Sequence, residues 1–118
     1  MYDESTMRGL AVQVDVDKLT GNADALVARL RAAAESAGFE FINEVRGNDN
    51  GPYVNMNFAA VDYIAGWSQL RRLFDDPDVG RQLAAATIIV CEGRESWNDY
   101  LLLHHFDPGE KVDDVHLR

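Results

Sequence analysis

Two neighbouring segments near the middle of the chain have the pattern of paired β-strands. Residues 52–59 alternate strictly: the apolar side carries Val54, Met56 and Phe58, and the other side carries Tyr53, Asn55 and Asn57. Residues 39–46 are also extended in character, and the polar run 47–51, with a glycine at each end, joins the two segments. Alternation with period two predicts half-buried strands. A hairpin of this kind needs a layer of helix over its apolar face.

The segments on either side of the hairpin supply that layer. Residues 23–37 repeat apolar positions at three and four, Asn22 or Thr20 can cap the helix, and Gly38 stands where a helix stops. A second helix is predicted from an Asp62 cap through an apolar stripe that ends at Phe74. We predict a separate short helix from Pro77 to Ala85, capped by Asp76, with a kinked continuation of the preceding helix as the alternative.

Three further segments have strand character. Residues 10–16 alternate, and residues 87–92 form a β-branched run without polar alternation, which is typical of a strand that is covered on both faces or central in its sheet. Residues 97–106 fit a strand with Tyr100, Leu102, His104 and Phe106 on one face. They also fit a helix after a Ser96 cap. We adopt the strand.

The element order predicts an α+β fold. Strand, helix, two strands, helix pair and one or two strands match the ferredoxin-like, split βαβ arrangement. This is a two-layer sandwich in which an antiparallel sheet of four to five strands carries its helices on one face. We expect a single domain over residues 1–118, with 1–8 and 108–118 flexible. This fold hosts many unrelated functions.

Charge and hydropathy narrow the class of protein. Twenty acidic residues against 11 basic ones give a formal net charge of −9. Such a chain repels a phosphate backbone and attracts basic partners, so we expect no nucleic-acid binding. No apolar run approaches the roughly 20 residues that cross a bilayer, and the acidic, polar first residues are unlike a signal peptide. We therefore expect no membrane association and a cytoplasmic location. The single Cys91 is interpreted as a buried apolar residue.

Candidate chemistry is sparse. His104 and His105 are adjacent, and neighbouring side chains on a strand point to opposite faces, so they could share one metal ion only if the segment were helical. Helix capping around Pro77 explains Asp75, Asp76 and Asp78 more simply than a cation site does. Neither Ser68 nor Ser96 is flanked by both glycines of a nucleophile elbow. We therefore expect no metal, no cofactor and no catalytic residue.

A contact surface is the more informative prediction. Asparagine is a poor strand former, so Asn55 and Asn57 beside Tyr53 indicate a face that touches something. Carboxylates and aromatic residues, which carry binding energy at interfaces, also gather near the end of the chain. The residues predicted to bind a partner are Glu92, Glu95, Trp97, Asp99, Tyr100, Tyr53, Asn55 and Asn57.

Two functions are compatible with these features. The first is an acidic binding protein without catalysis that masks a basic protein. In size, acidity and aromatic content the chain is similar to bacterial immunity proteins, which neutralise a toxin. The alternative is a homodimeric α+β barrel that encloses a pocket, acting as a small enzyme or ligand-binding domain, with His104 or His105 and Tyr53 as acid/base groups.

Overall fold

Five antiparallel strands form one sheet in the order β2-β3-β1-β4-β5. The computed structural model describes residues 7–115. The strands are β1 (Arg8–Asp15), β2 (Glu40–Asn48), β3 (Pro52–Ala60), β4 (Thr87–Gly93) and β5 (Ser96–His104). The predicted α+β class and antiparallel sheet are confirmed, and residues 96–104 form a strand rather than a helix.

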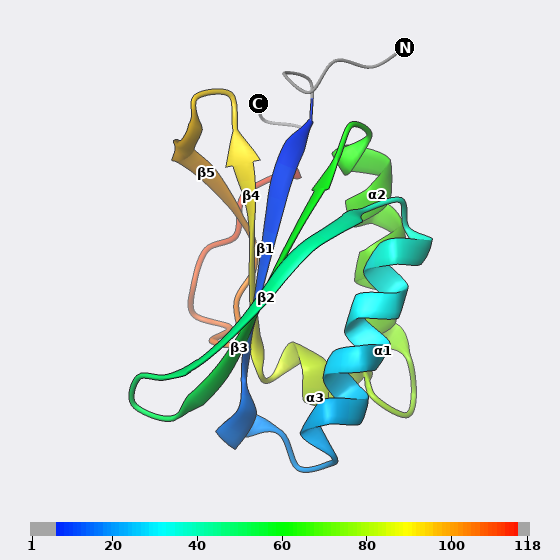
Figure 1. Ribbon diagram of the computed structural model, residues 1–118, viewed down its shortest axis with the longest axis vertical. Coiled ribbons are helices and arrows are strands. Elements are labelled where there is room, and N and C mark those ends of the chain that lie inside the picture. Colours follow the sequence, from blue (N-terminus) through cyan, green and yellow to red (C-terminus); the bar gives the residue numbers. More distant parts are fainter. Residues whose placement is uncertain (1–6, 116–118) are drawn as a thin grey trace.

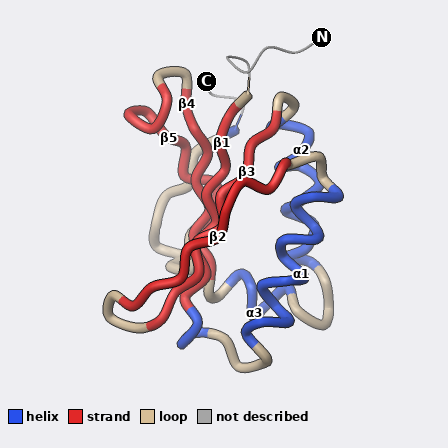
Figure 2. Tube along the Cα trace, in the orientation of Figure 1, coloured by secondary structure: helices blue, strands red, loops and turns tan. Residues whose placement is uncertain are grey.

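The helices lie together on one side of this sheet (Figures 1 and 2). They are α1 (Ala23–Ser36), α2 (Tyr63–Leu70) and α3 (Gly80–Ala84), with 3₁₀ turns η2 (Val16–Lys18) and η3 (Arg71–Asp75). Among residues 7–115 none of these helices is both long and apolar enough to span a membrane.

Predicted caps lie at the starts of the two longer helices, and the glycine predicted to stop α1 lies just after its end. The Oδ1 of Asn22 accepts a hydrogen bond from the Ala25 N–H at 3.0 Å, and the Oδ1 of Asp62 accepts one from the Ala65 N–H at 3.3 Å. These side chains satisfy amide groups that have no partner inside the helix. After α1, Gly38 has φ of 97°, a left-handed conformation that glycine adopts without steric cost.

The short helix predicted over residues 77–85 is wrong at its start. Helix α3 covers only Gly80–Ala84. The carboxylate of Asp76 accepts hydrogen bonds from the amides of Asp78 and Val79, so it caps a turn that precedes the helix. The Asp78 amide is the main cause that lowers the pKa of Asp76, and Arg29 pairs with the same carboxylate at 2.6 Å.

The core lies between the sheet and the helices. The buried apolar strand residues are Leu10, Val12, Val14, Val54, Met56, Phe58, Ala60, Ile89, Cys91, Leu101 and Leu103, and those from the two longer helices are Leu26, Val27, Leu30, Ala34, Trp67 and Leu70. Phe58 is among the largest fully buried side chains and makes edge-to-face ring contacts with Phe39 and Phe41 at centroid distances of 6.5 and 5.6 Å.

The chain after β5 returns along the outer edge of that strand. The Asp113 N–H donates to the Leu102 carbonyl at 2.7 Å, and the Asp113 carboxylate accepts from the Leu102 N–H at 2.8 Å. Val115 is buried. The expected flexibility of residues 1–8 and 108–118 stays a prediction, and residues 1–6 and 116–118 lie outside the described part of the chain.

Candidate functional site

One face of the sheet is left uncovered by the helices, and we call it the open face (Figure 1). Along β1, β3 and β4, buried residues alternate with partly exposed ones, so the second set faces away from the core. Register brings these residues together across strands: Gln13 of β1 lies between Asn55 of β3 and Ile88 of β4. The open face is therefore a continuous surface built from neighbouring strands.

Along β4 and β5 the open face holds an apolar depression of about 390 Å³, which we call the aromatic groove. Its lining residues are Ile88, Val90, Trp97, Tyr100, Leu102, His105 and Glu110. Trp97 is 44% exposed and Tyr100 is 54% exposed. Large aromatic side chains that remain exposed beside an apolar floor are typical of protein interfaces.

The indole of Trp97 is positioned by its neighbours on β1 and β4. It lies against Gly9, where an added Cβ would stand 2.8 Å from the indole Cζ2. The Glu92 carboxylate accepts hydrogen bonds from the Gly9 N–H at 2.7 Å and the Ser96 Oγ at 2.8 Å, which ties β1 to the turn that carries Trp97. Glu92, predicted as a partner-binding carboxylate, therefore makes contacts within the molecule that orient Trp97.

The same turn uses another of the predicted carboxylates. The Asp99 Oδ1 accepts from the Glu95 N–H at 2.8 Å, and Ser96 has φ of 65°, an uncommon conformation for a residue with a side chain. This bond closes the β4–β5 turn. Glu95 remains exposed at the tip of the turn.

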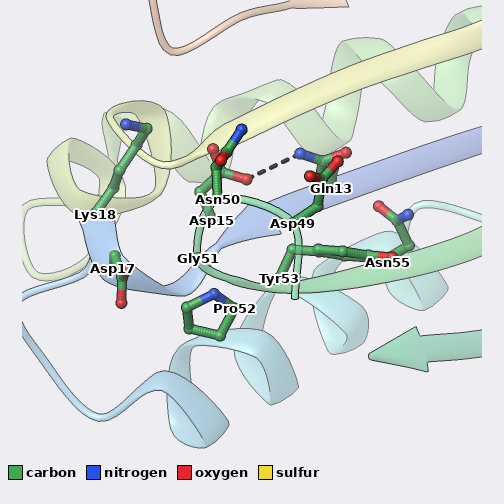
Figure 3. A pocket seen from close by; sticks show the side chains of 10 residues that line it. All are labelled: Gln13, Asp15, Asp17, Lys18, Asp49, Asn50, Gly51, Pro52, Tyr53 and Asn55. Atoms are coloured by element: carbon green, nitrogen blue, oxygen red, sulfur yellow. Dashed lines mark hydrogen bonds between the residues drawn. The ribbon is translucent and has the colours of Figure 1, made fainter. Parts of the chain in front are cut away.

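Beside the aromatic groove, on β1 and β3, lies a polar depression of about 420 Å³, which we call the carboxylate pocket. Figure 3 shows its lining residues Gln13, Asp15, Asp17, Lys18, Asp49, Asn50, Gly51, Pro52, Tyr53 and Asn55. The Gln13 Nε2 donates to the Asp15 Oδ1 at 2.9 Å. Three carboxylates and one ammonium group give this pocket a negative balance.

Of the three β3 residues predicted to bind a partner, two line this pocket and the third does not. Tyr53 and Asn55 line the carboxylate pocket. Tyr53 lies against Gly47 of β2, where any side chain would collide with the phenol. Asn57 instead donates from its Nδ2 to the Asn43 Oδ1 at 2.8 Å, a cross-strand pair that accounts for its place on a strand.

The predicted residues thus fall into two groups at opposite ends of the open face. Gly9, which marks the aromatic groove, and Asp15, in the carboxylate pocket, are six residues apart on β1, or about 20 Å at a strand rise of roughly 3.3 Å. The two depressions themselves adjoin, because Gln13 of the carboxylate pocket pairs with Ile88 of the aromatic groove.

Charge is distributed unequally between the two sides of the molecule. Arg29, Arg31, Arg71, Arg72 and Arg81 lie in the helical segments. Arg46 joins them by pairing with Asp24 of α1 at 3.0 Å. Arg8 also lies over the ring of Tyr63 of α2, 4.6 Å from its centroid, so seven of the 11 basic residues belong to or contact the helix layer. Among the residues that line the two depressions, Lys18 faces the carboxylates of Asp15, Asp17, Asp49 and Glu110, so the balance is negative and this face attracts cations.

His104 lies on the opposite side of the sheet from the one predicted. An irregularity in the β4–β5 pairing sets His104 opposite the buried Ile89, whereas Leu102 pairs with Val90 on the open face. The imidazole Nε2 is 2.8 Å from the Ala84 carbonyl oxygen, and the ring stacks on Phe74. Since a carbonyl only accepts, Nε2 carries the proton. His104 therefore joins β5 to the helix layer.

We expect His104 to make folding stability depend on pH. Burial is the main cause that lowers the pKa of His104, and the Ala84 carbonyl opposes it. The unfolded chain, with the ordinary histidine pKa of about 6.5, takes up its proton first as the pH falls. The stabilisation is therefore complete above this pH and is lost as the pH falls towards the lower folded pKa.

Urea unfolding between about pH 7 and pH 5, above the range in which ordinary carboxyl groups titrate, measures this effect. The variant His104→Gln keeps a neutral donor and should give a flatter profile than the wild type. Identical profiles for wild type and His104→Gln would contradict the prediction.

The metal and nucleophile alternatives find no support in the geometry. Within residues 7–115 no group of three or more His, Cys, Asp or Glu residues is placed to hold a metal ion. Cys91 is buried opposite Leu101, and burial raises the pKa of its thiol to about 11. A thiol with such a pKa is protonated at neutral pH and is a weak nucleophile.

Several residues of the open face are missing from the sequence prediction. Asp15, Asp17 and Asp49 belong to the carboxylate pocket, and Glu110 belongs to the aromatic groove. Alternation in β1 could have placed Asp15 beside Gln13 on the face opposite the core. The other three lie in connecting segments, whose positions follow no periodic pattern.

Comparison with known proteins gives no guide to the role of this face. No protein-family model matches the chain, and no curated protein or solved structure matches it.

Proposed function

We propose that the protein is a small, acidic, cytoplasmic binding protein that masks a basic protein partner with its open face, and that it is not an enzyme. The observation that carries this proposal is the pairing, on one uncovered face, of an aromatic groove with a carboxylate pocket. Aromatic anchors provide binding energy, and unpaired carboxylates accelerate the approach of a basic surface. The class of binding protein that we propose is a bacterial immunity protein, which neutralises a basic toxin.

The element order supports a ferredoxin-like, split βαβ topology for this scaffold. Strands β1 and β2 are joined through α1 with β3 between them, and β3 and β4 are joined through α2 and α3 with β1 between them. Strand β5 then extends the sheet beyond β4. Such a sheet leaves the face opposite the helices available for a partner.

The main competing function is a homodimeric α+β barrel in which two open faces enclose a pocket. The exposed Trp97 and Tyr100 favour it, since two copies could cover them. A net charge of −9 on each chain disfavours it, because two copies repel each other. A solution mass of twice 13.2 kDa would support this alternative over the binding protein.

A capture experiment with charge variants tests the proposal. The open-face variant Asp15→Asn/Asp49→Asn/Glu110→Gln and the helix-side control Asp24→Asn/Glu35→Gln/Asp78→Asn remove the same formal charge. Each protein is immobilised and exposed to a lysate of the cells that produce it, at low and high salt. We expect wild type and control to retain the same basic protein at low salt, and the open-face variant to retain at least about tenfold less.

Salt provides a second readout. Attraction between charges is screened over about 8 Å at physiological ionic strength, so the retained protein should be released more readily as salt rises. Equal capture by all three proteins, or a loss confined to the helix-side control, would refute the use of the open face.

A further inference from the structure

The aromatic groove combines three kinds of surface in one depression. Its floor is aliphatic, from Ile88, Val90 and Leu102, and its walls include the exposed rings of Trp97 and Tyr100. Polar groups come from the returning C-terminal segment. At about 390 Å³ the groove lies near the lower end of the range for small-molecule pockets, roughly 300–1,000 Å³. An occupant must satisfy all three surfaces.

The charged part of the groove is negative. Glu110 contributes a carboxylate. His105 accepts a hydrogen bond from the Asp107 N–H at its Nδ1, 3.0 Å away, and a ring nitrogen that accepts carries no proton. This nitrogen therefore offers no donor to an occupant of the groove, and Glu110 is the charged group among the lining residues. A cationic head group meets attraction here, and an anionic one meets repulsion.

An alkyl chain that ends in a cation satisfies these surfaces together. Methylene groups lose water against the aliphatic floor, the aromatic rings attract a cation over their faces, and Glu110 pairs with the charge. A purely apolar side chain would leave the carboxylate without a partner. A short polar side chain would leave the aliphatic floor of the groove exposed to water.

We propose that the aromatic groove receives the side chain of an arginine or lysine of the basic partner. This inference rests on the proposed function and specifies the contact that the open face makes. Charge complementarity selects this occupant over a second copy of the chain, because Glu110 is the charged residue among those that line the groove and each chain carries a net charge of −9. The Trp97 ring, held against Gly9 and the Glu92-anchored turn, is preorganised as a wall of the groove.

Titration of the ¹⁵N-labelled full chain with capped amino acids tests the groove without the partner. The probes are Nα-acetyl-arginine amide, Nα-acetyl-lysine amide and Nα-acetyl-citrulline amide, the last being a neutral analogue of arginine. The indole N–H signal of Trp97 reports on the groove. The buried Trp67 serves as an internal reference on the helix side. We expect millimolar, saturable shifts at Trp97 and at the Val90 and Leu102 amides with both cations, and much smaller shifts with citrulline.

Three variants locate the contact. Tyr100→Ala and Glu110→Gln should each weaken binding of the arginine probe by about two- to fivefold. Val112→Ala, at an exposed residue close to Glu110 that is not part of the groove, should leave it unchanged. Because all three residues are exposed, their replacement is not expected to unfold the chain.

The outcomes distinguish failure of the groove proposal from failure of the proposed function. Absence of shifts at Trp97, or equal shifts with citrulline and arginine, would overturn the groove proposal. If capture in the lysate experiment still depended on the open-face carboxylates, the proposed function would stand with a different contact. If the cationic probes bound the groove but no basic protein were captured, the proposed function would fail and the chemical selectivity of the groove would stand.

Discussion

Replacing Phe58 with alanine is expected to lower the free energy of unfolding by about 3–5 kcal/mol. Phe58 is 1% exposed and belongs to β3, whose neighbours on both sides are strands of the same sheet. Truncation removes the edge-to-face contacts with Phe39 and Phe41 and leaves a cavity that the surrounding strands cannot fill completely. Since domains of this kind have only about 5–15 kcal/mol of stability, a large part of the total would be lost.

Urea unfolding followed by circular dichroism measures this loss. The control is Tyr100→Ala, which deletes an aromatic ring of similar size at a residue 54% exposed on the open face. We expect the control to change stability far less, because most of the removed surface was already in contact with water. Comparable losses for both variants would mean that the burial of Phe58 is not the source of the loss.

Replacing Trp97 with alanine is expected to weaken binding of the basic partner by about 30-fold or more, the effect typical of an interface residue that contributes at least 2 kcal/mol. The indole is a wall of the aromatic groove and presents an exposed ring beside the aliphatic floor. Its removal takes away both apolar contact area and the ring face that would attract a cation. Affinity of the purified partner for wild type and variant, measured by isothermal titration, checks this.

Two further variants make the interpretation specific. Ile42→Ala removes an apolar side chain that is 57% exposed, against 44% for Trp97, from the edge strand β2 far from β5 in the sheet, and should leave binding unchanged. Gly9→Ala keeps the indole but places a Cβ 2.8 Å from it, so the ring must shift. We expect Gly9→Ala to weaken binding to an intermediate degree. Wild-type affinity in Trp97→Ala would remove Trp97 from the interface.

Local patterns predicted most of the elements because their causes are local. The caps at Asn22 and Asp62 and the stop at Gly38 follow from which backbone amides need partners and which residue tolerates positive φ. Around Pro77 the same reasoning went wrong. The Asp76 carboxylate can cap a single turn as well as a helix, and sequence alone does not distinguish the two.

The face occupied by His104 illustrates a second limit. Period-two alternation starting from Tyr100 puts His104 on the open face, but the irregular pairing opposite Ile89 and Val90 moves it to the core side. A bulge inserts one residue and so reverses the side of every residue beyond it. Its position depends on the partner strand, which a pattern read along one strand does not contain.

By itself, the amino-acid sequence determined the α+β class, the strand and helix segments and the acidic character, because alternation, capping and charge depend on residues close together in the chain. Only the tertiary structure decided that Tyr53 and Asn55 join Asp15 and Asp49 at one end of the open face, about 20 Å along β1 from the end where Trp97 lies. Strand order and register bring distant residues together, and both follow from packing of the whole core rather than from any single segment.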